Sequence, residues 1–187
     1  MQPIIYDVAV SADGFIAGRN ADVSAFPHDG PIVADYGTRL AGYAVALMGR
    51  ATYEFGYAYG LEPGANPYPH MRAIVVSRTI DLPDGNVEVW RDLLGLDTLR
   101  KMASGPIYLC GGGHLAGAVA NAGHLSELRL KRAPVILGGG TPLFAGLDGP
   151  LQTDPVAQTN YGQGLVFQSY RISSRPIAPT AGEGAAP

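Results

Sequence analysis

An apolar run that ends in three glycines is the segment of this chain with the clearest potential for chemistry. The run covers residues 107–110 and is followed by Gly111, Gly112 and Gly113, and then by an alanine-rich, helix-like segment, Leu115–Ala122. At a helix start, backbone N–H groups lack partners within the helix and the dipole favours negative charge. Glycine also lets a pyrophosphate approach the backbone. The motif therefore predicts a phosphate-binding turn, although glycines after a strand often serve only as turns.

Two further turns of the same kind follow apolar, strand-like runs. Their small and polar residues are Gly49, Arg50 and Thr52 after residues 44–48, and Ser77 and Arg78 at the end of the run that starts at residue 73. A guanidinium and a hydroxyl at a helix start can bind phosphate. The same residues would also suit a solvated helix cap or a polar strand end. Because the carboxyl ends of parallel strands meet at one edge of a sheet, the three turns predict one ligand site.

The elements that must position these turns alternate along the chain. Continuous apolar strands between helices indicate a mostly parallel sheet covered on both faces, with residues 156–161 and 165–172 as a closing antiparallel hairpin. The other expected strands are 4–10, 15–17, 44–48, 73–77, 87–90, 107–110, 127–131 and 135–137, and the expected helices are 32–42, 51–57, 96–103 and 115–122. Residues 1–172 are expected to form one α/β domain, and 173–187 a flexible tail.

Length and composition restrict the class of protein. The chain has 187 residues, 47% of them hydrophobic and 16% charged, with a net charge of −3, which indicates one globular domain. The absence of a basic run argues against nucleic acid as a partner. Without an export signal or an apolar run of about 20 residues, a cytoplasmic protein that does not cross a membrane is expected. The single cysteine, Cys110, excludes an internal disulfide and a cysteine-based zinc site, and the histidines lack metal-ligand spacing.

The order of these motifs resembles the dihydrofolate reductase-like superfamily. Residues 48–54 (Met-Gly-Arg-Ala-Thr-Tyr-Glu) resemble its strand-to-helix segment, 75–78 its next nucleotide-binding turn and 107–113 its glycine turn. Residues 11–17 and 127–140 are similar, more narrowly, to the reductase domain of the riboflavin-biosynthesis deaminase–reductases and their stand-alone relatives. The resemblance covers about residues 3–172. It implies a three-layer α/β/α fold, an NADPH cofactor, a small-molecule substrate and a homodimer, for which residues 165–171 could form the pairing edge.

The resemblance also implies a role for particular residues. Arg50, Ser77 and Arg78 would surround the 2′-phosphate of NADPH, the three glycines would lie under its pyrophosphate, and Ala9 and Ile16 would line its nicotinamide. The full set of implied cofactor contacts is Ala9, Ile16, Gly49, Arg50, Thr52, Ser77, Arg78, Gly111, Gly112, Gly113, His114 and Leu115. Asp13 belongs to a turn and is expected to be structural.

The catalytic acid is the least defined part of the site. Dihydrofolate reductases use an acid on the first helix, and Asp35 has this chemistry on the expected helix, although a gap of one or two residues is needed to align it. A solvent-facing acid would suit this position equally. Lys131 could reach a substrate phosphate or be solvated. The sequence thus favours an NADPH-dependent reductase of a small heterocyclic (pterin- or pyrimidine-like) or carbonyl substrate, and the alternative is a non-catalytic nucleotide- or ligand-binding protein of the same fold.

Overall fold

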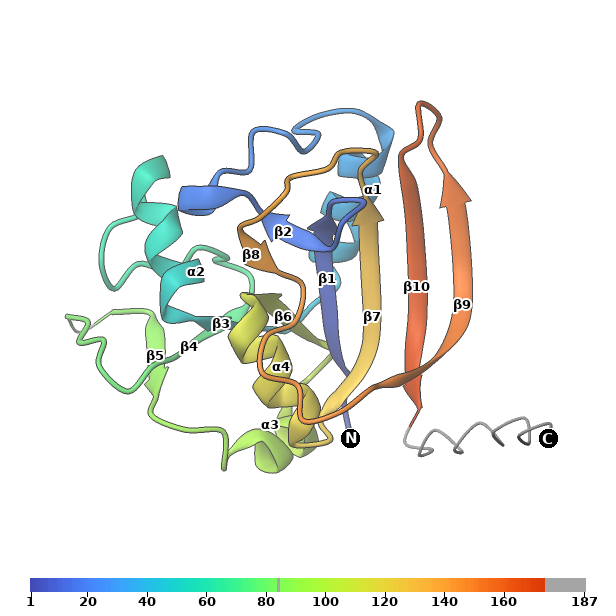
Figure 1. Cartoon of the computed structure of the whole chain (residues 1–187). Coiled ribbons are helices and arrows are strands. Elements are labelled where there is room, and N and C mark those ends of the chain that lie inside the picture. The colour runs from blue at the N-terminus through green and yellow to red at the C-terminus, as the bar shows by residue number, and fades with distance from the viewer. Residues whose placement is uncertain (84, 174–187) are drawn as a thin grey trace, which may run out of the picture.

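An eight-stranded sheet forms the centre of the part of the chain that the structure, a computed structural model, describes: residues 1–83 and 85–173 (Figure 1). The strand order is β5-β4-β3-β6-β1-β7-β10-β9. All pairs from β5 to β7 are parallel, and β10 and β9 close the sheet as an antiparallel hairpin. The strands are β1 (Ile4–Val10), β3 (Val45–Gly49), β4 (Arg72–Val76), β5 (Val87–Trp90), β6 (Ile107–Gly111), β7 (Leu125–Arg132), β9 (Gln152–Asn160) and β10 (Val166–Ser173).

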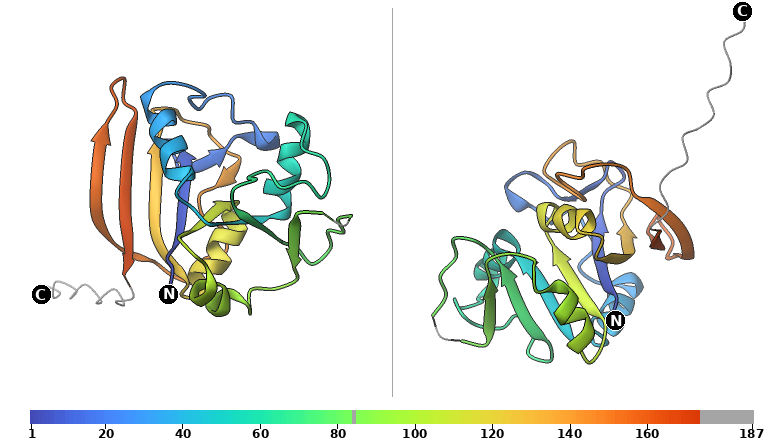
Figure 2. Two further views of the ribbon diagram at one scale, coloured as in Figure 1. Left: turned by 180° about the vertical axis from the view of Figure 1, so that it is seen from behind. Right: turned by 90° about the horizontal axis from the view of Figure 1, so that it is seen from below.

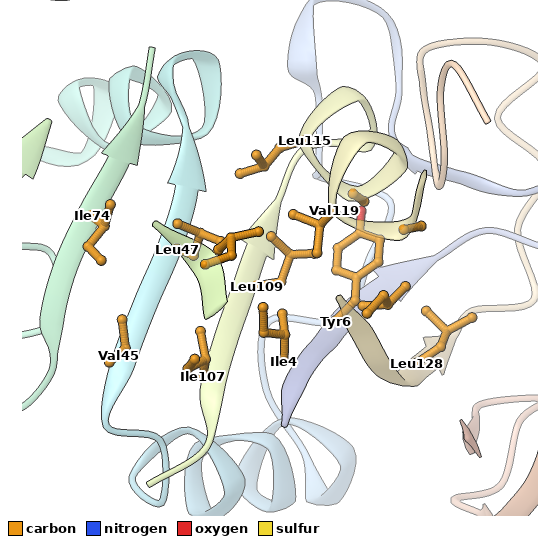
Figure 3. Close-up of a cluster of buried hydrophobic side chains, with 14 of the residues drawn as sticks. Ile4, Tyr6, Val45, Leu47, Ile74, Ile107, Leu109, Leu115, Val119 and Leu128 are labelled. Carbon is orange, nitrogen blue, oxygen red and sulfur yellow. The ribbon is translucent and has the colours of Figure 1, made fainter. Parts of the chain in front are cut away.

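Helices cover both faces of this sheet, as Figure 2 shows from two further sides. The helices are α1 (Pro31–Leu40), α2 (Arg50–Phe55), α3 (Leu96–Met102) and α4 (Gly113–Asn121), with short 3-10 turns η1 (Arg19–Ala21) and η2 (Gly56–Tyr59). Alternate residues of the central strands belong to two separate cores, because successive side chains of a strand point to opposite faces. Tyr6 and Leu109 pack with Val119 of α4 (Figure 3), whereas Ile5 and Tyr108 pack on the opposite face, the one that α1 covers.

A small antiparallel ribbon lies beside the ends of the central strands. It pairs β2 (Phe15–Ala17) with β8 (Thr141–Pro142). The chain after β8 then passes the start of α4, where the Ala145 N–H donates to the Gly113 carbonyl at 3.0 Å. The ribbon therefore links the first turn of the chain to the glycine turn.

The expected fold class is confirmed, and the differences are local. Residues 135–137 form no strand, because the N–H groups of Leu137 and Gly138 donate to the carboxylate of Asp13 instead of to a neighbouring strand. Strand β10 is not an edge, since it pairs with β7 on one side and β9 on the other. The edge strands of this sheet are β5 at one end and β9 at the other, and β9, next to β10, is exposed along most of its length.

The expected tail lies almost wholly outside the described residues. Ser173 is the last residue of β10, and 174–187 are not described. Over residues 1–83 and 85–173, no helix combines the length and apolar character needed to span a membrane. The same stretches contain no cluster of three or more histidine, cysteine or acidic side chains suited to a metal ion.

Candidate active site

A cavity of about 720 Å³ lies where β3 and β6 end and α2 and α4 begin. It brings together most of the predicted cofactor contacts, namely Ile16, Gly49, Arg50, Thr52, Gly112, Gly113, His114 and Leu115. Cys110 and the β8 residues Thr141 and Pro142 complete this side of the cavity. The three turns were predicted to meet at one edge of the sheet, and two of them do so here.

The start of α4 offers backbone donors to this cavity. The first α-helical hydrogen bond runs from the Ala116 N–H to the Gly112 carbonyl at 3.0 Å, so the N–H groups before Ala116 have no acceptor within the helix. Within the described part of the chain, no side chain caps this end, which begins at Gly112. A helix start of this kind attracts an anion through its N–H groups and its dipole.

The absence of a side chain has a different physical consequence at each of the three glycines of the turn. Gly111 has φ +119°, a region that other residues rarely adopt. A Cβ on Gly113 would lie 2.2 Å from the Pro142 carbonyl oxygen, so this glycine lets the β8 chain pass close to α4. A Cβ on Gly112 would meet only Thr52 Oγ1 at 3.6 Å and Thr141 Cγ2 at 3.8 Å, both side chains that line the cavity. Gly112 is therefore the glycine whose missing side chain leaves room for a ligand.

Arg50 is the cation of the first cavity. Its Nε lies 2.8 Å from Glu54 Oε1, and its Nη1 donates to Thr79 Oγ1 at 3.1 Å. The side chain is half-exposed, so its remaining donors can reach a ligand.

The predicted contacts Ser77 and Arg78 lie one strand further out and do not line the cavity. The Ser77 hydroxyl accepts from the N–H groups of Thr79 and Ile80 at 3.2 and 3.0 Å, which closes the turn after β4. Arg78 is exposed. The structure therefore gives Ser77 a role in the turn and leaves the predicted cofactor contact of both residues untested.

A second cavity of about 430 Å³ adjoins the first on the face of the sheet that α1 covers. Four residues line both cavities, Val8, Ile16, Val23 and Phe55. The remaining lining is largely apolar and aromatic, and includes the predicted contact Ala9 together with Phe26, Ile32, Tyr36, Tyr108 and Leu165. Two ligands, one in each cavity, would therefore meet at this common wall.

A buried charge cluster forms one side of the second cavity. The carboxylate of Asp7 is fully buried and accepts from Arg39 Nε at 2.8 Å and from the Tyr43 hydroxyl at 3.2 Å. Lys131 Nζ lies 3.6 Å from Asp7 Oδ1 and 3.1 Å from the centre of the Tyr36 ring. Burial lowers the pKa of Lys131 to about 8, against the opposing effect of Asp7. Lys131 is thus a largely buried, paired ammonium group and not a solvated one.

Two tyrosine hydroxyls line the same cavity. Those of Tyr36 and Tyr108 lie 2.7 Å apart, and burial raises the pKa of both well above the ordinary value. Both therefore stay protonated near neutral pH, and because one of them donates to the other, at most one O–H of the pair is left for a ligand.

Asp35 and Asp13 lie outside both cavities. Asp35 is exposed on α1 and accepts a hydrogen bond from the Tyr161 hydroxyl. The carboxylate of Asp13 accepts from the Ser11 hydroxyl and from two backbone N–H groups, which lower its pKa to about 2. The structural role expected for Asp13 is confirmed, whereas the structure does not bring Asp35 to the cavity where an acid would act.

Three residues of the second cavity were not predicted from the sequence as site residues: Asp7, Tyr36 and Tyr108. One signal was present, because Asp7 is the only charged residue in the otherwise apolar strand β1. A charged residue at a buried strand position needs partners, and so marks a site or a structural ion pair. Its partners Arg39 and Lys131 belong to α1 and β7, which no local pattern joins to β1.

The fold and these cavities define a class of protein: a three-layer α/β/α domain with adjoining cavities, the larger of which lies where two central strands end. The family follows from the sequence, because residues 2–167 match the model of the RibD C-terminal domain. The chain belongs to this family, and the resemblance drawn from its motifs is confirmed.

Known proteins of similar sequence and structure agree with this assignment. An uncharacterized protein of Bacillus subtilis, YyaP, is 28% identical over 176 residues, which cover 87% of this chain and 91% of YyaP. The fold is similar to that of a putative riboflavin biosynthesis protein from a Shewanella species, with TM-score 0.77 and 22% identity over 92% of this chain and 99% of that one. It is also similar to dihydrofolate reductase from Enterococcus faecalis complexed with NADP(H), with TM-score 0.67 and 18% identity over 91% and 96%.

Proposed function

We propose that this protein is an NADPH-dependent reductase that transfers a hydride to a small heterocyclic or carbonyl substrate. The observation that carries the proposal is the pair of adjoining cavities with a common wall of Val8, Ile16, Val23 and Phe55. Hydride transfer requires the donor ring and the acceptor to be in contact and shielded from water. A wall of apolar residues that serves both cavities meets this requirement.

The residues of the first cavity suit a dinucleotide. The open start of α4, the space left by Gly112 and the guanidinium of Arg50 provide donors and room for phosphate groups. His114 and Thr52 lie beside them on the same lining. When bound there, NADPH would supply the hydride from its nicotinamide ring.

The chain itself would bind, orient and shield the reactants. Arg50, Thr52 and the N–H groups of α4 would hold the phosphates, while Ile16 and the common wall would exclude water from the reacting atoms. On the substrate side, the second cavity offers Lys131 and one O–H of the Tyr36–Tyr108 hydroxyl pair to a polar acceptor atom. Asp35 remains the acid proposed from the sequence, and it would have to exchange its bond to Tyr161 for a contact with substrate.

Arg50 provides the test of cofactor preference. We expect Arg50→Ala to raise the Kd for NADPH about tenfold or more, because a charge-assisted bond to the 2′-phosphate contributes roughly 1.5–3 kcal/mol. The Kd for NADH should change much less. Fluorescence titration with both cofactors measures this, with Arg171→Ala, an exposed arginine of β10, as the control.

An equal loss of affinity for NADPH and NADH would remove the 2′-phosphate role of Arg50. Stoichiometric NADPH binding without oxidation, over a panel of pterin, flavin-precursor and carbonyl compounds, would favour a non-catalytic ligand-binding protein instead. We also propose a homodimer, as the family resemblance implies, with the exposed strand β9 as an available edge.

A further inference from the structure

The second cavity presents hydrogen-bond donors to a ligand and offers it no free carboxylate. Among the described residues of its lining, Asp7 is the only carboxylic acid, and Arg39, Tyr43 and Lys131 already occupy its oxygens. An amino-substituted pyrimidine or pterin presents several N–H groups, and the described side chains of the lining offer them tyrosine hydroxyl oxygens but no free carboxylate. A carbonyl oxygen only accepts, so it matches the donors that are present.

Lys131 provides an ammonium donor at this position. Its ammonium group lies between Asp7 Oδ1, at 3.6 Å, and the face of the Tyr36 ring, at 3.1 Å, and its side chain is 13% exposed. An ammonium group has three N–H donors, so one remains for a ligand after these two contacts. Asp7 holds the lysine in place without taking its full donor capacity.

The groups that face Lys131 set its charge. Those with an electrostatic effect on it are Asp7 on β1, Arg39 on α1 and Cys110 on β6. The other ionisable groups on the lining of the same cavity are Tyr36, whose ring contacts the ammonium group, Tyr108 and His28. Burial and then the Arg39 guanidinium lower the pKa of Lys131 to about 8, and Asp7 opposes them. A general acid works best when its pKa is close to the working pH.

We infer that Lys131 donates the proton in this reductase, and that the acceptor bound beside it is an uncharged, planar carbonyl compound. The inference rests on the proposed function. Hydride addition to the carbonyl carbon leaves a negative charge on the oxygen, and the Lys131 ammonium group transfers one proton to it. The products are an alcohol, NADP⁺ and a neutral amine that solvent reprotonates. With a quinone, the carbon that received the hydride then loses a proton to solvent and the second carbonyl oxygen gains one, which gives the hydroquinone.

The uncharged character of the acceptor follows from the lining. Apart from Asp7, Lys131 and the exposed His28, the described lining residues are apolar or aromatic. A phosphate or carboxylate that entered this cavity would lose its hydration. In return it would contact a single ammonium group, whose charge Asp7 partly neutralises, so its desolvation would be poorly compensated. A flat, neutral ketone or quinone loses less solvation and gains contact with Tyr36, Tyr108 and Phe55.

The experiment measures NADPH oxidation with isatin and menadione, two flat neutral carbonyl compounds. In Lys131→Met the chain length is kept without the charge, and in Lys131→Arg the charge is kept on a group that does not release a proton near neutral pH. We expect both variants to lower kcat about a hundredfold or more while the Kd for NADPH stays unchanged. Lys101→Met, at the exposed lysine of α3, is the control and should retain wild-type kcat.

The pH profile separates proton donation from a purely structural role. Only the ammonium form can donate, so wild-type kcat should be high below about pH 8 and fall as the pH rises through the pKa of Lys131. This limb should be absent in Lys131→Met. Because Lys101 and Lys131 are the two lysines of the chain, NMR of the protein with isotopically labelled lysine can also follow both amines directly, without any substrate.

Each negative result of these experiments would contradict a different part of the proposal. If wild-type protein does not bind NADPH, the proposed function itself is wrong. If it binds NADPH but reduces neither isatin nor menadione, the carbonyl assignment is wrong, and equal turnover of the carboxylate phenylglyoxylate would contradict an uncharged acceptor. Retention of kcat and of the pH limb in the Lys131 variants, together with their loss in Asp35→Asn, would transfer the proton-donor role to Asp35.

Discussion

At the scale of single side chains, Asp7 provides the negative charge that balances the cations beside the second cavity. Its carboxylate is fully buried and lies against the guanidinium of Arg39 and the ammonium group of Lys131. Asp7→Asn would leave both cations short of their counter-charge in a buried place. We expect the free energy of unfolding to fall by about 3 kcal/mol, because removal of one partner from a buried ion pair is much more costly than removal from an exposed one.

Urea unfolding monitored by circular dichroism measures this change. Glu88→Gln is the matched control, since Glu88 pairs with Arg72 at the surface, where both side chains are nearly half-exposed. The control should cost less than about 1 kcal/mol. If Asp7→Asn and Glu88→Gln lowered the free energy of unfolding equally, the buried Asp7 ion pairs would contribute no more to stability than the exposed pair.

Residue types that carry their own local signal could be predicted from the sequence. These residues are Gly112, Gly113, Arg50 and Thr52, which adjoin apolar strand-like runs and all line the first cavity. Asp7 was visible only as an anomaly in an apolar strand. Its partners come from other elements, so the sequence gives no distance between the charges. The same limit applies to Asp35, whose bond to Tyr161 depends on how the β9–β10 turn packs against α1.

At the contact between α4 and β8, we expect alanine substitutions of Gly113 and Gly112 to have opposite effects on stability and on cofactor binding. Gly113→Ala would place a Cβ 2.2 Å from the Pro142 carbonyl oxygen, so the β8 chain would have to move away from the start of α4. We expect a loss of at least about 2 kcal/mol in the free energy of unfolding. Gly112→Ala meets its neighbours at ordinary contact distances, so its cost to stability should stay below about 1 kcal/mol.

For cofactor affinity we expect the reverse order, with the larger effect from Gly112→Ala. An alanine at position 112 puts a methyl group between Thr52 and Thr141 in the cavity, so the Kd for NADPH should rise about tenfold or more. Urea unfolding and NADPH titration of both variants provide the comparison. A stable Gly113→Ala, or a Gly112→Ala that binds NADPH normally, would contradict this division of roles.

Elements built from continuous apolar runs were predictable because their signal is local. Strands β1, β3 and β6 and the turns after them lie where the pattern placed them, within a residue or two. Residues 135–137 look equally apolar but form no strand, because Asp13, more than 100 residues earlier, takes up the N–H groups of Leu137 and Gly138. A competing side chain from a distant turn is not visible in a local pattern.

For the molecule as a unit, the order of the motifs predicted the sheet but not the second cavity. The first cavity lies where neighbouring parallel strands end, which is a general place for ligands in such folds. The second is assembled from β1, α1, β6, β7 and the turn before β10, which meet only in the finished fold. Its chemistry could therefore be derived only from the structure.

NADPH binding to the first cavity should raise the thermal stability of the protein, because the site joins β3, β6, α2, α4 and the β2–β8 ribbon, which exist together only in the folded state. At a concentration 100 times its Kd, a ligand of the folded state adds about 2.7 kcal/mol, which corresponds to a Tm increase of roughly 5–10 °C for a domain of this size. Differential scanning fluorimetry measures the shift. We expect a smaller shift with NADH at the same concentration, and at most about half the shift with NADPH in Gly112→Ala, because a tenfold higher Kd leaves about 1.4 kcal/mol at that concentration. A full shift in that variant would place the cofactor elsewhere on the molecule.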